Sequence, residues 1–288
     1  MSRSRSSSSQ SESSKLKPGS SIAGSHDLAI SFCGCGFLGL YHCGAARCMT
    51  VHGSSVLARC KRFAGASAGA LVAALLLTSS ETIDIAANLV LALAEEVRSL
   101  KYGLLNREFS LSHRVYDEMS RLLPEEAHKV VTNKLFISMT DRDTLKGRLE
   151  SHFETREKLL KCLVASSYIP FFSGIHENPP EIEGCRYIDG GICLNLPVFR
   201  DLRTITISPF HSSDADVSPV DDRLFFDWRF TVGKQKLQFS YNNFIRGKQA
   251  LIPPSDEILR EYLERGFIDM MIFLKKNDVF ERLEGSEV

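Results

Sequence analysis

The sequence has 288 residues, of which 43% are hydrophobic and 24% are charged, a composition typical of a globular protein with a substantial core. Its 35 basic and 35 acidic residues cancel to a formal net charge of zero. This argues against nucleic acid as a partner, because nucleic-acid-binding proteins usually carry a basic excess. The longest stretch without a charge or a breaker is residues 68–77, and a transmembrane helix needs about 20 apolar residues. With no recognisable signal peptide, we expect a cytoplasmic protein without a transmembrane segment.

The eight cysteines do not follow the spacing of a metal site. Cys33 and Cys35 are one residue apart, no C-x-x-C pair occurs, and five of the eight lie between residues 33 and 60, in a region that reads as core. A cytoplasmic chain of this size needs no disulfides. We therefore expect reduced, buried, structural cysteines and no bound metal.

The chain begins with a serine-rich segment, residues 1–24, that has almost no apolar side chains. Such a segment cannot bury enough surface to offset the entropy lost on ordering, so we expect a disordered tail. The ordered part is predicted to begin at Leu28, the first residue of an apolar run that ends in a glycine cluster.

Strands and helices are predicted to alternate from there. The predicted strands cover residues 28–32, 62–64, 136–139, 145–149, 186–188 and 204–207. The predicted helices cover residues 39–51, 70–77, 80–100 and 156–166. Ser80 and Thr155 are the candidate N-caps of the last two helices. This alternation favours an α/β fold around a largely parallel sheet.

The C-terminal part combines an acidic loop, residues 214–222, with a late apolar stripe. The stripe has helical spacing and consists of Ile258, Leu259, Tyr262, Leu263, Phe267, Met270, Met271 and Leu274. It predicts a helix packed on the body of the protein; a membrane-facing helix is the alternative, because amphipathic helices do both.

The first motif with chemical content is G-x-S-x-G at residues 65–69, between a predicted strand and a predicted core helix. A serine on a sharp strand-to-helix turn projects its hydroxyl out of the sheet, and the crowded backbone requires tiny neighbours. Gly65 and Gly69 supply them around Ser67. The helix N-terminus behind the serine also favours a developing oxyanion. Ser67 is therefore a candidate nucleophile.

The second motif is G-x-G-x-x-G at residues 34–39, again between a strand and a helix. A dinucleotide site requires an acidic residue about 20 positions further on, but no Asp or Glu occurs between Asp27 and Glu81. The arginines in this stretch leave NADP open as an alternative. The other use of such a loop is to point backbone N–H groups at one oxygen, which suits an oxyanion hole beside Ser67.

The third motif is Asp189-Gly190-Gly191, at the end of a short predicted strand. A serine hydroxyl needs a base, and two candidates exist: Asp189 alone, or a triad with His211, the only histidine after it. Asp189 alone requires a desolvated pocket that raises its pKa from about 3.9. His42, on a predicted core helix, is expected to be structural.

Together, and in this order, the three motifs resemble the patatin-like phospholipase family over roughly residues 28–210. Residues 31–42 resemble the branch that contains adiponutrin and adipose triglyceride lipase. The resemblance implies a three-layer α/β fold with a mostly parallel central sheet and helices on both faces. It places the acyl-hydrolase domain at residues 28–210. Residues 211–288, with the acidic loop and the C-terminal helices, are expected to pack on the same domain.

The resemblance also implies a Ser–Asp dyad with no catalytic histidine. Ser67 is then the nucleophile, Asp189 the base, and the loop of Gly34, Cys35 and Gly36 the oxyanion hole. The glycines that support these motifs are Gly39, Gly65, Gly69, Gly190 and Gly191. No metal or organic cofactor is implied.

The implied substrates are esters of neutral lipids, triacylglycerol and retinyl ester, with transfer of the acyl group to other lipids as a second activity. Plant patatins have a glycine and a basic residue where this chain has Cys35 and Leu38. The N–H of Cys35 still donates, whereas the missing charge disfavours phosphate-bearing lipids. The expected partner is lipid at a membrane or lipid-droplet surface, contacted through residues 262–274 or Phe37 and Leu38. The sequence gives no indication of a protein activator.

Two alternatives to a neutral-lipid hydrolase remain at this point. A phospholipase A-type hydrolase would use the same residues on a different ester. A non-catalytic lipid-binding module would hold acyl chains in the same pocket while Ser67 does little.

Overall fold

A seven-stranded mixed sheet forms the centre of the computed structural model, which describes residues 22–174, 177–220, 228–232, 235–239 and 241–282. The sheet strands are β1 (Leu28–Phe32), β2 (Cys60–Ala66), β3 (Leu135–Asp141), β4 (Gly147–Glu150), β5 (Glu181–Ile182), β6 (Cys185–Asp189) and β7 (Arg203–Ile207). Their order is β5-β6-β3-β2-β1-β7, with β4 also paired to β3. A separate hairpin joins β8 (Trp228–Val232) and β9 (Gln235–Phe239).

The four strands β7, β1, β2 and β3 are parallel, and β4 and β6 run antiparallel to β3. Every residue of β1 is buried, as expected for a parallel strand covered on both faces. The expected largely parallel α/β sheet is therefore confirmed. The predicted hairpin at 136–149 is confirmed too, and its turn accounts for part of the antiparallel pairing.

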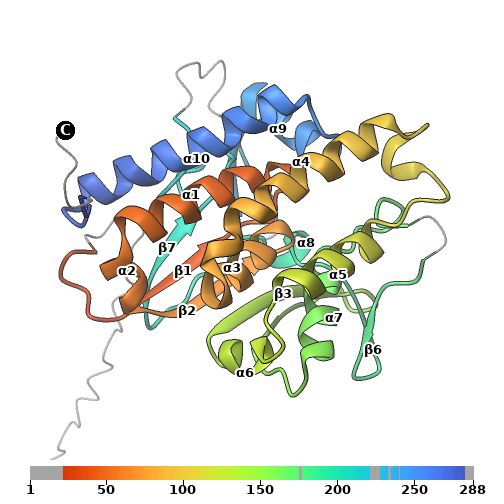
Figure 1. Cartoon of the computed structure of the whole chain (residues 1–288), viewed down its shortest axis with the longest axis horizontal. Helices are drawn as coiled ribbons and strands as arrows, with labels where there is room; N and C mark the ends of the chain where they lie inside the picture. The colour runs from red at the N-terminus through yellow and green to blue at the C-terminus, as the bar shows by residue number, and fades with distance from the viewer. Residues whose placement is uncertain (1–21, 175–176, 221–227, 233–234, 240, 283–288) are drawn as a thin grey trace, which may run out of the picture.

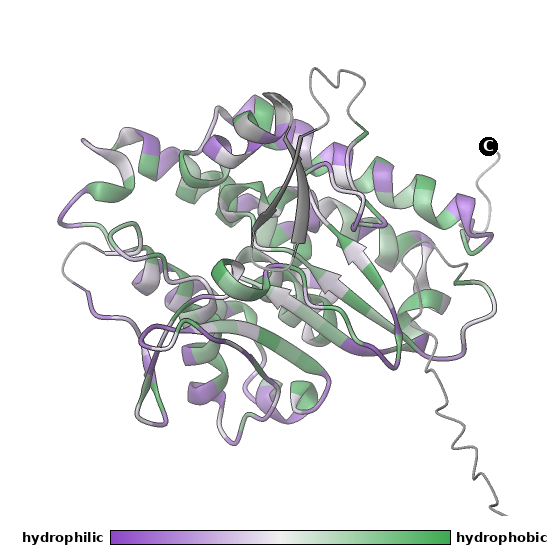
Figure 2. Cartoon of the chain, turned by 180° about the vertical axis from the view of Figure 1, so that it is seen from behind, coloured by the Kyte–Doolittle hydropathy of each residue, from purple (hydrophilic) through white to green (hydrophobic). Residues whose placement is uncertain are grey.

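Helices cover both faces of the sheet. They are α1 (Gly39–His52), α2 (Ser54–Arg59), α3 (Ala68–Thr78), α4 (Ile83–Ser99), α5 (Leu111–Leu122), α6 (Ala127–Val131), α7 (Arg156–Ser166), α8 (Gly191–Leu194), α9 (Tyr241–Leu251) and α10 (Asp256–Lys276). The long helices α1, α3, α5 and α7 lie toward the viewer in Figure 1. The short α8 lies in front of the strands when the molecule is seen from behind in Figure 2. This is the expected three-layer arrangement.

The late apolar stripe forms α10, as predicted, and it packs along α1 (Figure 1). The two helices cross closely, because glycines stand at the crossing. A Cβ on Gly266 would lie 1.9 Å from the carbonyl oxygen of Tyr41, and one on Gly44 would lie 1.9 Å from that of Leu263. The contact is completed by the Tyr41 hydroxyl, which donates to Asp269 at 2.9 Å.

Several local predictions differ from the structure. The helix predicted to start at Ser80 begins instead at Ile83, after a 3-10 turn over Ser80–Thr82, and no side chain caps it. Thr155 does cap α7, accepting from the N–H of Lys158 at 3.1 Å. The helices α5 and α6 lie in a stretch for which the pattern predicted no element.

The predicted acidic loop is partly built into the fold. Asp216 is buried and pairs with buried Arg203, with a shortest N–O distance of 2.6 Å, and it accepts from the N–H of Thr206 at 2.9 Å. Residues 221–222 of the predicted loop lie outside the described residues. The sequence predicted only an acidic loop here, because it gives no sign that Arg203 is buried and pairs with one of these aspartates.

The expected N-terminal tail lies outside the described residues up to position 21. Ile22 belongs to the predicted tail but is fully buried in the core, so the ordered part begins before Leu28. All eight cysteines are free thiols; Cys185 is exposed, and the prediction that every cysteine is buried is wrong there. Among the described residues, no helix combines the length and apolarity required to cross a membrane.

Candidate active site

Ser67 lies on the sharp turn between β2 and α3. Its φ and ψ are 52° and −131°, a conformation that non-glycine residues rarely adopt and that is typical of functional sites. The turn is tight enough that a Cβ on Gly65 would lie 2.4 Å from the carbonyl carbon of Gly69, and one on Gly69 would lie 2.4 Å from the carbonyl oxygen of Phe32. The predicted strand-to-helix elbow is therefore present, and tiny residues are a steric requirement of it.

The register of the sheet brings Asp189 to this elbow. Ala66, the last residue of β2, is paired with Ser138 of β3, and the next residue of β3, Met139, is paired with Asp189 at the end of β6. Gly190 then passes directly over β3, where a Cβ would lie 2.0 Å from the carbonyl oxygen of Ser138. Residues 122 positions apart in the chain thus meet, and Asp189 accepts a hydrogen bond from the Ser67 side chain.

The carboxyl group of Asp189 is in an unusual electrostatic environment. Only 7% of the residue is exposed, and burial raises the pKa of this carboxyl from 3.8 to about 6. The N–H of Gly191, which donates to Oδ1 at 2.6 Å, and the Ser67 hydroxyl partly offset that effect. A carboxylate with a pKa near neutrality is a far better proton acceptor than an ordinary aspartate.

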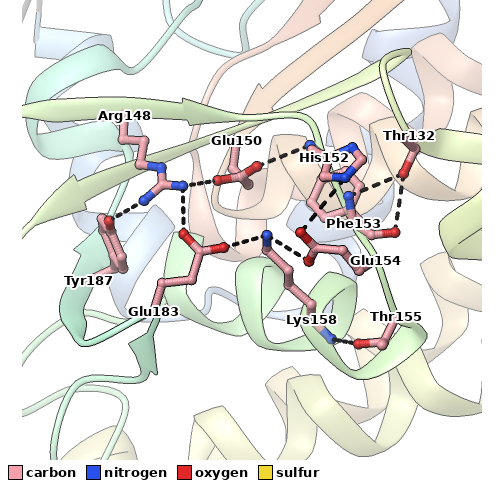
Figure 3. A network of polar contacts seen from close by, with 10 residues as sticks. All are labelled: Thr132, Arg148, Glu150, His152, Phe153, Glu154, Thr155, Lys158, Glu183 and Tyr187. Carbon is pink, nitrogen blue, oxygen red and sulfur yellow. Dashed lines mark hydrogen bonds and ion pairs between the residues drawn. The ribbon is translucent and has the colours of Figure 1, made fainter.

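A network of charged side chains holds β6, the strand that ends at Asp189 (Figure 3). Arg148 of β4 donates to the hydroxyl of Tyr187 at 2.7 Å and also pairs with Glu150 and Glu183. Lys158 of α7 reaches the same Glu183 at 2.6 Å. The network joins β4, α7 and the β5–β6 hairpin, so it fixes the strand two residues before Asp189.

The predicted oxyanion loop lies between β1 and α1. No hydrogen bond within the described part of the chain uses the N–H groups of Cys35 or Gly36, nor that of Ala68, the first residue of α3. Gly34 is different, because its N–H donates to Oδ1 of Asn195 at 2.9 Å. Burial raises the pKa of the Cys35 thiol well above its ordinary value, so the loop carries no negative charge there.

Asn195 is a site residue that the motifs did not reveal. Its Oδ1 lies 2.8 Å from the position of a Cβ on Gly34 and 2.9 Å from that of a Cβ on Gly191. The amide therefore lies between the oxyanion loop and the turn that carries Asp189. The only signal in the sequence was an asparagine six residues after that aspartate, in a segment with no strong secondary-structure pattern.

Ser166, the last residue of α7, is a second residue that the motifs missed. Its hydroxyl accepts from the N–H of Ser67 at 2.8 Å and donates to the carbonyl oxygen of Ser138 at 2.7 Å. Its own carbonyl oxygen accepts from the N–H of Gly190 at 3.2 Å. One serine thus connects the elbow, the neighbouring strand and the Asp189 turn.

The two histidines considered earlier are both away from the Ser67–Asp189 pair. Nδ1 of His211 lies 2.9 Å from the carbonyl oxygen of Pro219, and among the described residues no hydrogen bond joins this ring to Ser67 or Asp189. His42 is fully buried in α1, and its Nε2 lies 2.8 Å from the carbonyl oxygen of Cys33. As predicted, His42 is part of the packing; it holds the strand end that leads into the oxyanion loop.

Ser67 opens into an apolar pocket of about 230 Å³. Helices α3, α4 and α5 form most of its wall, with Leu71 and Leu75, Val90 and Leu93, and Val115 and Met119 among the lining side chains. Arg114 is the one cationic side chain of the described lining, and Glu96 pairs with it. The site therefore has a polar, hydrogen-bonded end at Ser67 and room for a long apolar group.

The described residues contain no cluster of three or more His, Cys, Asp or Glu side chains with metal-binding geometry. The loop of residues 34–39 that also fits a nucleotide fingerprint is closely packed. A Cβ on Gly36 would lie 2.0 Å from the carbonyl oxygen of Ala250, and one on Gly39 would lie 3.2 Å from the Ala68 side chain.

Comparison with known proteins gives the same family throughout. The family profile described as patatin-like phospholipase matches residues 30–201. The human patatin-like phospholipase domain-containing protein 4 is 39% identical over 254 residues, which cover 88% of this chain and 99% of that protein. The bovine patatin-like phospholipase domain-containing protein 2 is 35% identical over 253 residues. The human 1-acylglycerol-3-phosphate O-acyltransferase PNPLA3 is 33% identical over 257 residues.

The match to the last two relatives covers 88% of this chain but only 51% and 52% of their lengths, so the chain spans about half of each. Among solved structures, VipD from Legionella pneumophila shares the fold with a TM-score of 0.50 at 12% identity, covering 94% of this chain and 72% of that one. The profile and the sequence relatives agree on one assignment. The chain belongs to the patatin-like phospholipase family, a family of lipid hydrolases and acyltransferases.

Proposed function

We propose that the protein is a serine acyl hydrolase that cleaves the ester bonds of neutral lipids through Ser67 and Asp189. The observation that carries the proposal is the hydrogen-bonded Ser67–Asp189 pair at the end of an apolar pocket of about 230 Å³. The pocket accepts an acyl chain, and the ester carbonyl then lies at the serine.

In this mechanism, Oγ of Ser67 attacks the ester carbonyl while Asp189 accepts its proton. The N–H groups of Cys35, Gly36 and Ala68 receive the negative charge on the carbonyl oxygen, and the N-terminus of α3 favours the same charge. Gly34 acts differently from its neighbours, since its N–H anchors the loop to Asn195. Asp189 then gives this proton to the leaving alcohol, and the acyl group stays bonded to Ser67.

The second half of the reaction decides between hydrolysis and transfer. Water that attacks the acyl-enzyme gives a fatty acid, whereas a lipid alcohol gives a new ester; in both cases Asp189 accepts the proton of the attacking hydroxyl. One relative is named as an O-acyltransferase, which supports acyl transfer as a second activity.

Neutral lipids, triacylglycerol and retinyl ester among them, are the proposed substrates. The support is electrostatic: Glu96 already neutralises Arg114, the cation of the pocket, and Leu38 at the oxyanion loop is uncharged and fully buried. A phosphate-bearing lipid would bring a charge that neither position pairs. The enzyme would act while bound peripherally to a membrane or a lipid droplet.

The test is a substrate panel with wild type and Ser67→Ala. Fatty acid release is measured from triacylglycerol emulsion, retinyl ester micelles, phosphatidylcholine vesicles and a water-soluble short-chain ester. The proposal predicts release by the wild type from the neutral esters and none by the variant. Faster turnover of phosphatidylcholine would indicate the phospholipase alternative. Turnover by the variant equal to that of the wild type would contradict Ser67 as the nucleophile, and no release by either chain would leave only the lipid-binding alternative.

A further inference from the structure

The described chain exposes several apolar side chains at or next to residues that line the acyl pocket. We call this set the pocket rim and define it as Tyr102, Leu105, Phe171, Leu251 and Ile252. Leu251 itself lines the pocket, and the others adjoin lining residues such as Leu104 and Phe172. We infer that the pocket rim inserts into the surface of aggregated neutral lipid, so that the ester passes from that surface to Ser67 without crossing water. The inference rests on the proposed function.

The rim contains two strongly exposed aromatic side chains. Tyr102 is 74% exposed and Phe171 is 69% exposed, and they come from two separate connections, one between α4 and α5 and one after α7. Aromatic side chains on a soluble surface are unfavourable unless a partner covers them. An apolar ring with a polar edge is also the group that settles at the boundary of lipid and water.

The backbone shows where a side chain can be removed without loss of stability. Tyr102 and Phe171 both have positive φ, 73° and 71°, in the left-handed region that disfavours residues with a Cβ. Glycine would relieve that strain at both positions. The same strain occurs at exposed Leu145, outside the pocket lining, which makes that position a matched control.

The rim is held in place by polar contacts at its base. Arg98 at the end of α4 donates to the carbonyl oxygen of Pro254 at 2.5 Å and pairs with Asp256 at 2.6 Å. These contacts hold the connection after α4 against the one between α9 and α10 (Figure 1). On the other side, the N–H of Ser112 in α5 donates to the carbonyl oxygen of Ser173 at 3.3 Å. The exposed side chains therefore stand on connections that are fixed to one another.

The surfaces expected from the sequence are not available. Phe37 and Leu38 are buried, so they cannot reach a lipid surface, and the main stripe of α10 faces α1. The exposed large apolar side chains of α10 are those of Ile268 and Ile272, and they do not line the pocket. This outer face of α10 is the competing surface in the test.

The experiment measures flotation of the protein with triolein droplets coated with phosphatidylcholine. It uses the Ser67→Ala chain, so binding is measured without hydrolysis and independently of the proposed catalytic function. The test variant carries Tyr102→Gly and Phe171→Gly. Both changes remove an exposed apolar side chain at a position where glycine suits the backbone, so the melting temperature should hold or rise. Each lost aromatic ring is expected to weaken binding about tenfold.

Two control variants make the same kind of change elsewhere. Leu145→Gly removes an exposed apolar side chain at another position with positive φ, 52°, in the turn between β3 and β4 and outside the pocket lining. Ile268→Ser with Ile272→Ser removes the outer face of α10. Both should float as the parent does, and raised salt should not release the parent because the contact is apolar.

Three results would overturn the inference. The rim variant could float like the parent, either control could lose as much binding as the rim variant, or raised salt could abolish binding of the parent. In active chains, the rim variant should lose more activity on the triolein emulsion than on a soluble ester. If the Ser67→Ala parent does not float while the wild type hydrolyses triolein, the docking surface is contradicted and the proposed hydrolase stands.

Discussion

The site has two regions built on opposite principles. The catalytic corner, which consists of Ser67, Asp189, Asn195 and the loop of residues 34–36, is buried, and short distances fix its positions. The pocket rim is exposed and apolar, and its connections present side chains outward. Both regions hold residues at positive φ, Ser67 in one and Tyr102 and Phe171 in the other. By our proposals, Ser67 takes part in proton transfer in the corner, and Tyr102 and Phe171 contact lipid at the rim.

This difference separates what each region should lose on mutation. Changes in the corner should act on every substrate, because the chemistry is common to all esters. Changes at the rim should act on aggregated substrates.

Asp189→Asn should lower kcat on a soluble short-chain ester by about 10³–10⁴-fold, because it removes the base while the hydrogen-bonding shape of the side chain is kept. Steady-state kinetics with the soluble ester, compared with those on emulsion, give the measurement. A loss on the emulsion alone would contradict the comparison, because it would make Asp189 act through lipid contact and not through chemistry.

Asn195→Ala should lower kcat about 10- to 100-fold with little change in KM, because the freed Gly34 N–H lets the oxyanion loop shift. Asn195→Asp keeps the acceptor but adds a charge beside Asp189, so it should move the acidic limb of the pH profile upward. Asn243→Ala, which removes another buried asparagine with hydrogen bonds at His211, is the control. Equal losses for both Ala variants would mean that Asn195 has only a structural role.

Activity on the soluble ester should fall about tenfold for each pH unit below about 6, because Asp189 must be ionised to accept a proton and its pKa is raised to about 6. The proton binds the folded state more tightly than the unfolded one, so the ionised carboxyl destabilises the fold above that pH. Asp189→Asn should therefore be more stable by on the order of 1–3 kcal/mol at neutral pH. The gain should shrink as the pH falls from 6 toward 3.8. Unfolding by denaturant at several pH values measures it, and a constant gain would contradict the assignment.

His211→Ala should leave kcat on the soluble ester within about threefold of the wild type, because its ring bonds the Pro219 carbonyl oxygen and not the Ser67–Asp189 pair. The same assay measures it. A loss of several orders of magnitude would restore the triad that the sequence left open.

The corner was predictable from the sequence because its constraints act on residue size. Gly65, Gly69 and Gly190 stand where a Cβ would meet backbone atoms, so the chain has no other choice there. The strands were predictable as well, because their apolar runs end at those turns. Asn195 and Ser166 were not predictable, since the hydrogen bonds through which they act reach residues far along the chain.

The rim was missed for a different reason. In the sequence, the apolar residues Leu105 and Ile252 look like core residues. The apolar stripe of α10, which looked like a possible surface for lipid, is largely packed against α1. The sequence shows which side chains are apolar but not which of them the fold leaves uncovered. Positive φ at Tyr102 and Phe171 has no sequence signal either, because neither residue type favours it.

The central claim is that Asp189 activates Ser67, and fluorophosphonate labelling followed by intact-protein mass measurement tests it most directly. Wild type, Ser67→Ala and Asp189→Asn are treated side by side at neutral pH. The account predicts one adduct on the wild type, none on Ser67→Ala, and labelling of Asp189→Asn that is slower by orders of magnitude. An adduct on Ser67→Ala, or equal labelling rates for wild type and Asp189→Asn, would contradict it.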